Sequence, residues 1–166
     1  MNDFWLRSFG VPPASVQRKS VTLDRLALGA DWDRLTAAAF LINDYEGARS
    51  HAARYREFGE RIGTKLAALV RRGLATPEEQ YQAAVTHVAS MRGRLARIFE
   101  DFDVIVSPAA TGPAPAGYET TGDPSANAPW TALGVPAISV PTFPVGTQLT
   151  AAWNNDDALV AFAATM

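Results

Sequence analysis

The chain changes character near residue 103, and this change limits what it can fold into. Before residue 103, apolar side chains recur every three or four residues, which is the period of one helix face. After it, short apolar runs alternate with proline and glycine, and eight of the 11 prolines lie between Pro108 and Pro144. Helices followed by strands predict an α/β fold rather than a helical bundle.

Two helical stretches are predicted before residue 76. The first begins at Asp31, the expected N-cap, because an apolar face follows it. The second contains Gly59 and Gly63 but keeps a helical period, and it is expected to end with Gly73 at the C′ position. The apolar face of the first stretch comprises Trp32, Leu35, Ala38, Ala39, Ile42 and Tyr45.

A third helix is predicted from Thr76. Thr76 and Glu79 have the spacing of a capping box, and Pro77 suits the first helical position, where a missing N–H costs nothing. A long apolar stripe follows, which is typical of core packing. It consists of Tyr81, Ala84, Val85, Val88, Met91, Leu95, Ile98 and Phe99.

Three apolar runs predict strands in the last third of the chain. Residues 103–108 and 137–141 are continuous apolar runs ended by proline, which favours strands buried on both faces of a mixed sheet covered by helices. Residues 147–151 are a third candidate, and a last helix is expected from Asp156 or Asp157. Near the N-terminus, Val21–Leu23 is a candidate strand, and Pro12-Pro13 marks a turn or an extended entry. We expect one partial domain over residues 1–166, with a helical part at about 31–102 and a strand and loop part at about 103–166.

Composition excludes several classes of protein. The absence of cysteine excludes disulfides and thiolate nucleophiles, and no apolar run is long enough to span a bilayer. All 15 Lys and Arg residues lie at or before Arg97, where acidic residues are interleaved with them, so no basic stripe for nucleic acid is seen. Without a visible secretory signal, a soluble cytoplasmic protein is expected, with neither a membrane nor a nucleic acid as partner.

The segment between the first two predicted strands is the first candidate for function. It reads as a loop of roughly 20 residues, which is uncommon in a compact domain unless it is functional. It begins at the carboxyl end of a buried strand, where α/β sheets place ligand crevices. The alternative is an ordinary surface crossover in which residues 121–124 form a turn.

Other chemistries have weaker support. His51 and His87 have no partner at the spacing of a zinc site, so neither a metal nor a cofactor is expected. Glu119 and Asp123 flank a turn and give little support to a mechanism with paired carboxylates. Ser107 is interpreted as a structural hydroxyl rather than a nucleophile, because no base is within obvious reach.

Several motifs in the last third resemble the amidase-signature family in their order and spacing. They are DFDVIVSPA, the Pro113–Pro115 step, a TGD turn, an Asn-x-Pro-Trp segment, GVPAISVP, PVGTQL and DDALV. The resemblance covers about residues 100–160 and is looser over 30–100, where LINDYEGARS matches a family helix.

The resemblance implies a large α/β fold around a mixed twisted sheet. It implies hydrolysis of carboxamide bonds by a serine nucleophile, with a second serine, a lysine and a Gly-Gly-Ser-Ser run that stabilises the oxyanion. It also implies that one stretch of this chain lines the pocket for a small amide substrate. The candidate substrate-binding residues are Thr121, Asn127, Trp130 and Thr131, with a core aromatic as the alternative interpretation of Trp130.

The chain departs from the family in its catalytic set. It has no Gly-Gly-Ser-Ser run, and its only lysines, Lys19 and Lys65, do not match the catalytic lysine, so no catalytic residue is assigned. The chain therefore resembles the C-terminal portion of an amidase, with an amidase N-terminal half or a homo-oligomer as expected partner. A non-catalytic binding or interaction module derived from an amidase is the alternative. The short connection between Val140 and Val145 is expected to tighten or unpair the last two strands.

Overall fold

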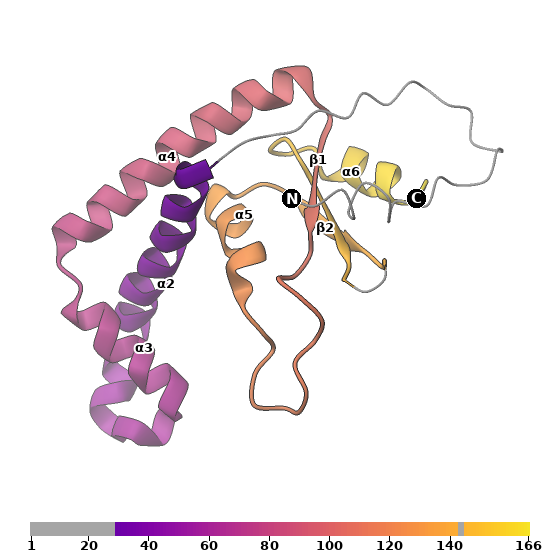
Figure 1. Cartoon of the computed structure of the whole chain (residues 1–166). Coiled ribbons are helices and arrows are strands. Elements are labelled where there is room, and N and C mark those ends of the chain that lie inside the picture. The colour runs from indigo at the N-terminus through magenta and orange to yellow at the C-terminus, as the bar shows by residue number, and fades with distance from the viewer. Residues whose placement is uncertain (1–28, 143–144) are drawn as a thin grey trace. The chain divides into compact units, whose positions relative to one another are not determined.

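A computed structural model describes residues 29–142 and 145–166 (Figure 1). The predicted turn or extended entry at Pro12-Pro13 and the candidate strand at Val21–Leu23 lie outside these residues. The described residues form two compact units. We call residues 29–102 with 127–134 the helical unit, and the described residues of 103–126 and 135–166 the strand unit. That the whole chain is one partial domain stays a prediction.

The helical unit is built on one long helix. The helix α2 spans Gly29–Phe58, and the 3-10 turn η1 at Gly59–Ile62 leads into α3 at Thr64–Ala75. Two further helices complete the unit, α4 at Glu78–Asp101 and the short α5 at Ala128–Leu133. Their buried apolar side chains form the core of the unit: Leu35, Ala38, Ala39, Tyr45, Ala48, Ala67, Val70, Ala84, Val88, Met91, Leu95, Trp130 and Leu133.

The prediction that Asp31 caps the first helix is wrong. The helix α2 already includes Gly29, so Asp31 lies in its first turn. The carboxylate of Asp31 pairs with Arg94 of α4 at 2.6 Å. The Asp31 carboxylate thus pairs with Arg94, which is distant in sequence, and does not cap the helix.

Gly73 was predicted to end its helix. It lies instead within α3, where it is buried. A Cβ atom at this position would come within 1.9 Å of the Asp44 carbonyl oxygen and 2.5 Å of the Ala48 side chain. The glycine is therefore needed for the close approach of α3 to α2. Beside this contact, Arg72 donates to both carboxylate oxygens of Asp44 at 2.7 and 3.0 Å. Its hydrogen bond with Asp44 raises the pKa of Arg72.

The capping box predicted at Thr76 is also wrong. Pro77 is the N-cap residue of α4, and no side chain bonds to the first turn there. The hydroxyl of Thr76 instead donates backward to the Arg72 carbonyl at 2.9 Å. Thr76 is the C-cap residue of α3, and its hydroxyl serves that helix end.

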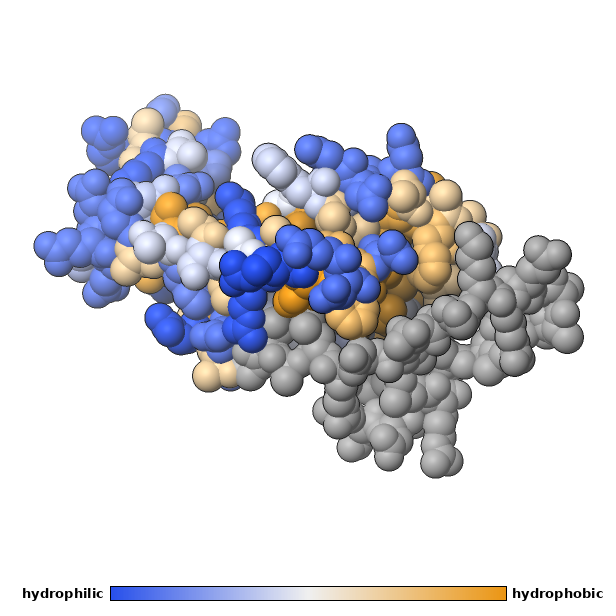
Figure 2. Space-filling view, turned by 90° about the horizontal axis from the view of Figure 1, so that it is seen from above, coloured by the Kyte–Doolittle hydropathy of each residue, from blue (hydrophilic) through white to orange (hydrophobic). Residues whose placement is uncertain are grey.

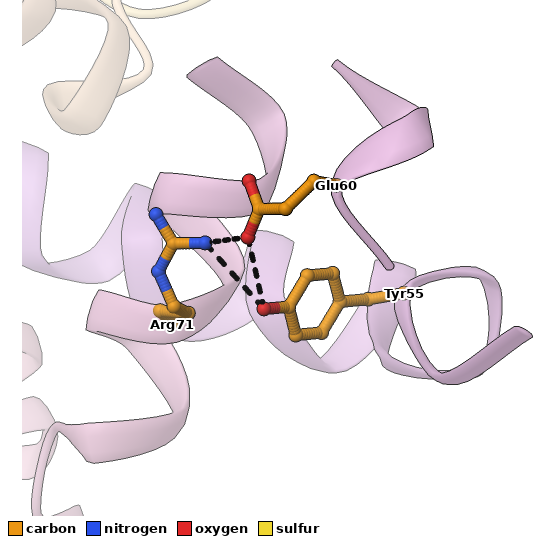
Figure 3. Close-up of polar contacts among 3 residues, drawn as sticks. All are labelled: Tyr55, Glu60 and Arg71. Carbon is orange, nitrogen blue, oxygen red and sulfur yellow. Dashed lines mark hydrogen bonds and ion pairs between the residues drawn. The ribbon is translucent and has the colours of Figure 1, made fainter. Parts of the chain in front are cut away.

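A group of exposed polar side chains links η1 to its neighbours (Figure 3). The Tyr55 hydroxyl donates to Glu60 at 3.3 Å, and Arg71 pairs with Glu60 and approaches the same hydroxyl. The contact with Tyr55, followed by the charge of Glu60, raises the pKa of Arg71. Exposed pairs of this kind contribute little to stability, so we interpret the group as ordering a turn.

The strand unit holds a three-stranded antiparallel sheet. The strands β1 at Val104–Pro108, β2 at Ala137–Val140 and β3 at Thr147–Ala151 are arranged in the order β1-β3-β2. The helix α6 at Asp156–Ala163 places Leu159 against Leu149 and Ala151. The predicted α/β class, the three strands and the last helix are confirmed.

Burial of the strands differs from the prediction. β1 is half-buried along its whole length, and β2 alternates between exposed and half-buried positions, so neither is buried on both faces. β3 is buried at all five positions. The strand order explains this, because β3 has a neighbour on each side whereas β1 and β2 have one each among the described residues.

The connection before β3 does not unpair the last strands. Ala137–Val140 pairs with β3 over four residue pairs, from Ala137 opposite Thr150 to Val140 opposite Thr147. The Thr142 hydroxyl donates to the Val145 carbonyl at 2.7 Å and lies 2.9 Å from the Thr147 hydroxyl. These bonds tie Thr142, directly after β2, to the residues that lead into β3.

The two units differ in surface character. Figure 2 shows a mainly hydrophilic surface over the long helices and more apolar surface over the strand unit. Large exposed apolar side chains of the strand unit include Trp153, Val160, Phe162 and Met166. No helix among the described residues is long and apolar enough to cross a membrane.

Candidate functional site

The segment between β1 and β2 is not the structureless loop that was predicted. It contains the 3-10 turn η2 at Pro124–Ala126 and the helix α5. Local signals for this helix were present in the sequence: Pro129 stands near its start, and Gly134 ends it in the left-handed conformation, with a φ of 72°. The prolines around it suggested a loop instead.

Thr121 lies in the strand unit, in the turn before η2. Its side chain is exposed, and Gly122 beside it has a φ of 102°. The Gly122 N–H donates to the Thr120 hydroxyl at 3.1 Å. Asp123 accepts from the backbone and the hydroxyl of Ser125 at 2.9 and 2.8 Å. Both carboxylate oxygens of Asp123 thus stabilise the turn, so the presence of an acidic residue here needs no catalytic explanation.

Asn127, Trp130 and Thr131 lie together on the short helix α5 of the helical unit. Asn127 is exposed at the N-cap position. The exposed Thr131 hydroxyl donates to the Asn127 carbonyl at 3.3 Å. The structure thus brings three of the four candidates together, while Thr121 belongs to the other unit.

Trp130 packs in the core of the helical unit. It is 3% exposed, and its ring centroid lies 4.6 Å from that of Trp32 in α2, with an interplanar angle of 57°. Its indole N–H is buried and has no hydrogen-bond partner among the described residues. Such burial favours the interpretation of Trp130 as a core aromatic residue. The indole N–H is the only polar group of the Trp130 side chain.

Arg92 positions α5, a role that the sequence patterns do not predict. Its guanidinium donates to the carbonyls of Leu133 at 2.9 Å and Ala132 at 2.7 Å, in the last turn of α5. Those carbonyls have no partner within the helix, and a cation at the C-terminal end also suits the helix dipole. The two partners are about 40 residues apart in sequence, so no local pattern could have revealed the contact.

The remaining candidates do not form a reactive group. The Ser107 oxygen is buried and has no hydrogen-bond partner among the described residues, so no base activates it there. His87 lies 3.4 Å from the Asp31 carbonyl oxygen. Across residues 29–142 and 145–166, no group of three His, Cys, Asp or Glu side chains could hold a metal ion.

Solved structures resemble this chain, although no family model and no curated protein matches it. An amidase crystal structure aligns with 80% of the chain at a TM-score of 0.70 and 24% sequence identity. The chain has the fold of one segment of an amidase. A protein of a vestigial complex, tied to the evolutionary origins of an s-triazine catabolic enzyme, aligns with 79% at 0.68 and 25%. A 6-aminohexanoate cyclic dimer hydrolase aligns with 81% at 0.55 and 20%.

The amidase-like segment is only part of each of these proteins. The aligned regions make up 34%, 33% and 39% of the three neighbours, in the same order. This chain therefore spans about one third of the length of the structures that it resembles.

Proposed function

We propose that this chain is the C-terminal portion of an amidase-signature amidohydrolase and contributes to carboxamide hydrolysis only together with the segment that carries the Ser-Ser-Lys set. The observation that carries the proposal is the likeness of four fifths of the chain to one third of an amidase. The chain itself has no Gly-Gly-Ser-Ser run. A serine hydroxyl needs a base and preorganised oxyanion donors, and the described residues place no base beside the Ser107 oxygen.

In this proposal the chain forms part of the wall of the substrate pocket. Thr121, Asn127 and Thr131 carry exposed polar groups suited to the amide and its substituents. Trp130 supports Asn127 and Thr131, because its buried ring holds α5 against α2.

The second candidate is a non-catalytic binding module derived from an amidase. The observation that favours it is that two candidate side chains of α5 already have partners within the chain. The Trp130 ring packs against Trp32, and the Thr131 hydroxyl donates to the Asn127 carbonyl. In that case the amidase fold is kept without its chemistry.

The test combines the purified chain with an amidase segment that carries the Gly-Gly-Ser-Ser run and the lysine, taken from the same genomic neighbourhood. We expect no hydrolysis of simple aryl amides by the chain alone and clear hydrolysis by the combination. The combination with the first serine of that run replaced by alanine is the control. Turnover by the chain alone would overturn the proposal, and an inert but stable complex would favour the binding module.

A further inference from the structure

An irregular segment of the strand unit leads from the end of β1 to the 3-10 turn η2 (Figure 1). We call residues 111–121 of this segment the arm. Every residue of the arm except Gly112 is exposed, and Tyr118 has a relative exposure of 104%. The Tyr118 side chain is therefore as accessible as in an extended peptide, although aromatic rings usually bury a large area.

The composition of the arm does not suit a loop that stays in water. Residues 113–118 read Pro-Ala-Pro-Ala-Gly-Tyr, and the Tyr118 hydroxyl is their only polar side-chain group. The one charged residue of the arm is Glu119. A run of exposed apolar residues is a fault in a native surface unless it serves a function, and the cores of protein interfaces are poor in charge and rich in tyrosine. The arm thus has the composition of a contact surface.

The conformation of the arm is constrained along its length. Pro113 and Pro115 fix their own φ angles and restrict the residue before each of them to extended conformations. Gly117 turns the chain with a φ of 85°. A Cβ atom at Gly122 would lie 3.7 Å from ring atoms of Pro115, so the two limbs of the turn approach each other. Tyr118 is thus presented beside a turn that has little freedom to lose on binding.

Hydrogen bonds fasten the base of the arm on both sides. Ala109, just after β1, donates its N–H to the Gly146 carbonyl at 2.8 Å. On the other side, Asp123 accepts from the backbone and the hydroxyl of Ser125 at 2.9 and 2.8 Å. The arm therefore extends from an ordered base.

We infer that this chain uses the arm to bind the amidase segment that carries the Ser-Ser-Lys set, which we call the catalytic segment. The inference rests on the proposed function, because it takes that segment as the partner. The aligned region makes up only 34% of the amidase neighbour, so most of that protein lies outside the part that this chain resembles. A contact surface on this chain has its first use against that remaining part.

The chemistry of the arm specifies the surface that fits it, an apolar groove lined by aromatic side chains. Proline-rich segments bind such grooves because their extended conformation is already formed. The Tyr118 ring supplies the anchor, and its hydroxyl can form a hydrogen bond at the rim. Thr121, a candidate substrate-binding residue, is the last residue of the arm. Binding through residues 113–118 thus brings Thr121 to the catalytic segment.

Titration calorimetry of the full chain with the catalytic segment tests this inference. Tyr118→Ala should raise the Kd about tenfold or more, because it removes the anchor of the contact. Trp153→Ala is the matched control, since Trp153 is an aromatic residue of the same unit that lies outside the arm and is 74% exposed. It should leave the Kd unchanged. Circular dichroism melting of both variants checks that their fold is retained.

Limited digestion with chymotrypsin gives a second measurement on the unaltered chain. This protease cleaves after accessible aromatic residues, so the free chain should be cut after Tyr118 and after Trp153. The catalytic segment should protect the bond after Tyr118 and leave the bond after Trp153 open. Cleavage after Tyr118 at the same rate with and without the catalytic segment would overturn the inference.

The calorimetry can overturn it in three ways: no complex forms, Tyr118→Ala leaves the Kd unchanged, or both variants raise the Kd equally. Failure of the proposed function appears separately, in the hydrolysis of amides. A complex that depends on Tyr118 but hydrolyses no amide contradicts the proposed function and supports the role of the arm. An active enzyme whose assembly is indifferent to Tyr118 does the reverse.

Discussion

At the scale of single residues, Gly73 decides how closely α3 can approach α2. Gly73→Ala would place a methyl group 1.9 Å from the Asp44 carbonyl oxygen, which is backbone and cannot swing away. We expect the free energy of unfolding to fall by about 1–3 kcal/mol or more. Urea denaturation followed by circular dichroism measures this change.

Gly93 provides the matched control in α4. A Cβ atom built at Gly93 meets nothing within 4 Å. Gly93→Ala should therefore raise the free energy of unfolding by about 0.5–1 kcal/mol, because alanine loses less conformational freedom in a helix. If the two substitutions changed stability alike, Gly73 would not be a packing residue.

Three single residues show where local sequence patterns fail to predict helix ends. Local patterns assigned Asp31 and Thr76 to helix caps and Gly73 to a helix end. Thr76 bonds locally to Arg72. The other two serve contacts with another helix: Asp31 pairs with Arg94, and Gly73 packs against Asp44. Caps depend on local spacing, whereas the partners of Asp31 and Gly73 are fixed only once the helices meet.

At the scale of elements, Arg92 holds the helix α5 that carries most of the candidate site. Arg92→Ala removes the donors to the Ala132 and Leu133 carbonyls, so we expect a loss of about 1–2 kcal/mol in the free energy of unfolding. Arg97→Ala, an exposed position on the same helix, should change stability by less than about 0.5 kcal/mol. Chemical denaturation of both variants checks this, and equal effects would contradict the positioning role.

A second contact, between α2 and α4, is expected to weaken at high pH. The Tyr81 hydroxyl donates to Glu46 at 2.7 Å, and its ring stacks on Tyr45 with centroids 4.1 Å apart. The hydrogen bond to Glu46, with burial as a further cause, raises the pKa of Tyr81 above its ordinary value of about 10. Only the protonated hydroxyl donates to Glu46.

The stability from this hydrogen bond is therefore fully present below pH ~10 and is lost as the pH rises through the folded-state pKa. Tyr81→Phe should melt at a lower temperature than the wild type at neutral pH, and the difference should shrink in strongly alkaline solution. Thermal unfolding at both pH values measures it. A difference that stays constant with pH would show that Glu46 does not accept from the ionisable hydroxyl.

Elements with strong local periodicity were the most predictable part of the fold. The positions of β2 and β3 follow from apolar runs between prolines and glycines, and the start of α6 was predicted at Asp156 or Asp157, where the helix begins. The helix α5 was missed because six residues among prolines give little periodic signal, and its stability comes from Arg92 and Trp32. Which strand is central was also out of reach, since strand order is set by pairing and not by the composition of each strand.

At the scale of the whole molecule, the proposed function gives the candidate site a role only beside a further segment that carries the catalytic set. The motifs predicted an amidase-like segment, and the structural likeness supports that fold. The sequence could nominate Thr121, Asn127, Trp130 and Thr131 only through resemblance, because no catalytic group of this chain identifies a pocket by its own chemistry. The role of these residues in substrate binding remains a prediction that the combined enzyme can test.

Thr131 offers the sharpest test, because the chain contains a closely matched threonine. Both Thr131 and Thr86 are exposed helical residues whose hydroxyls donate to the carbonyl four residues earlier. Replacing either by alanine removes the same local bond, so their effects on folding should be similar. In the enzyme combined with its catalytic segment, Thr131→Ala should lower kcat/KM about 2- to 10-fold through one lost hydrogen bond to substrate. Thr86→Ala should leave kcat/KM unchanged, and equal values for both variants would remove Thr131 from the pocket.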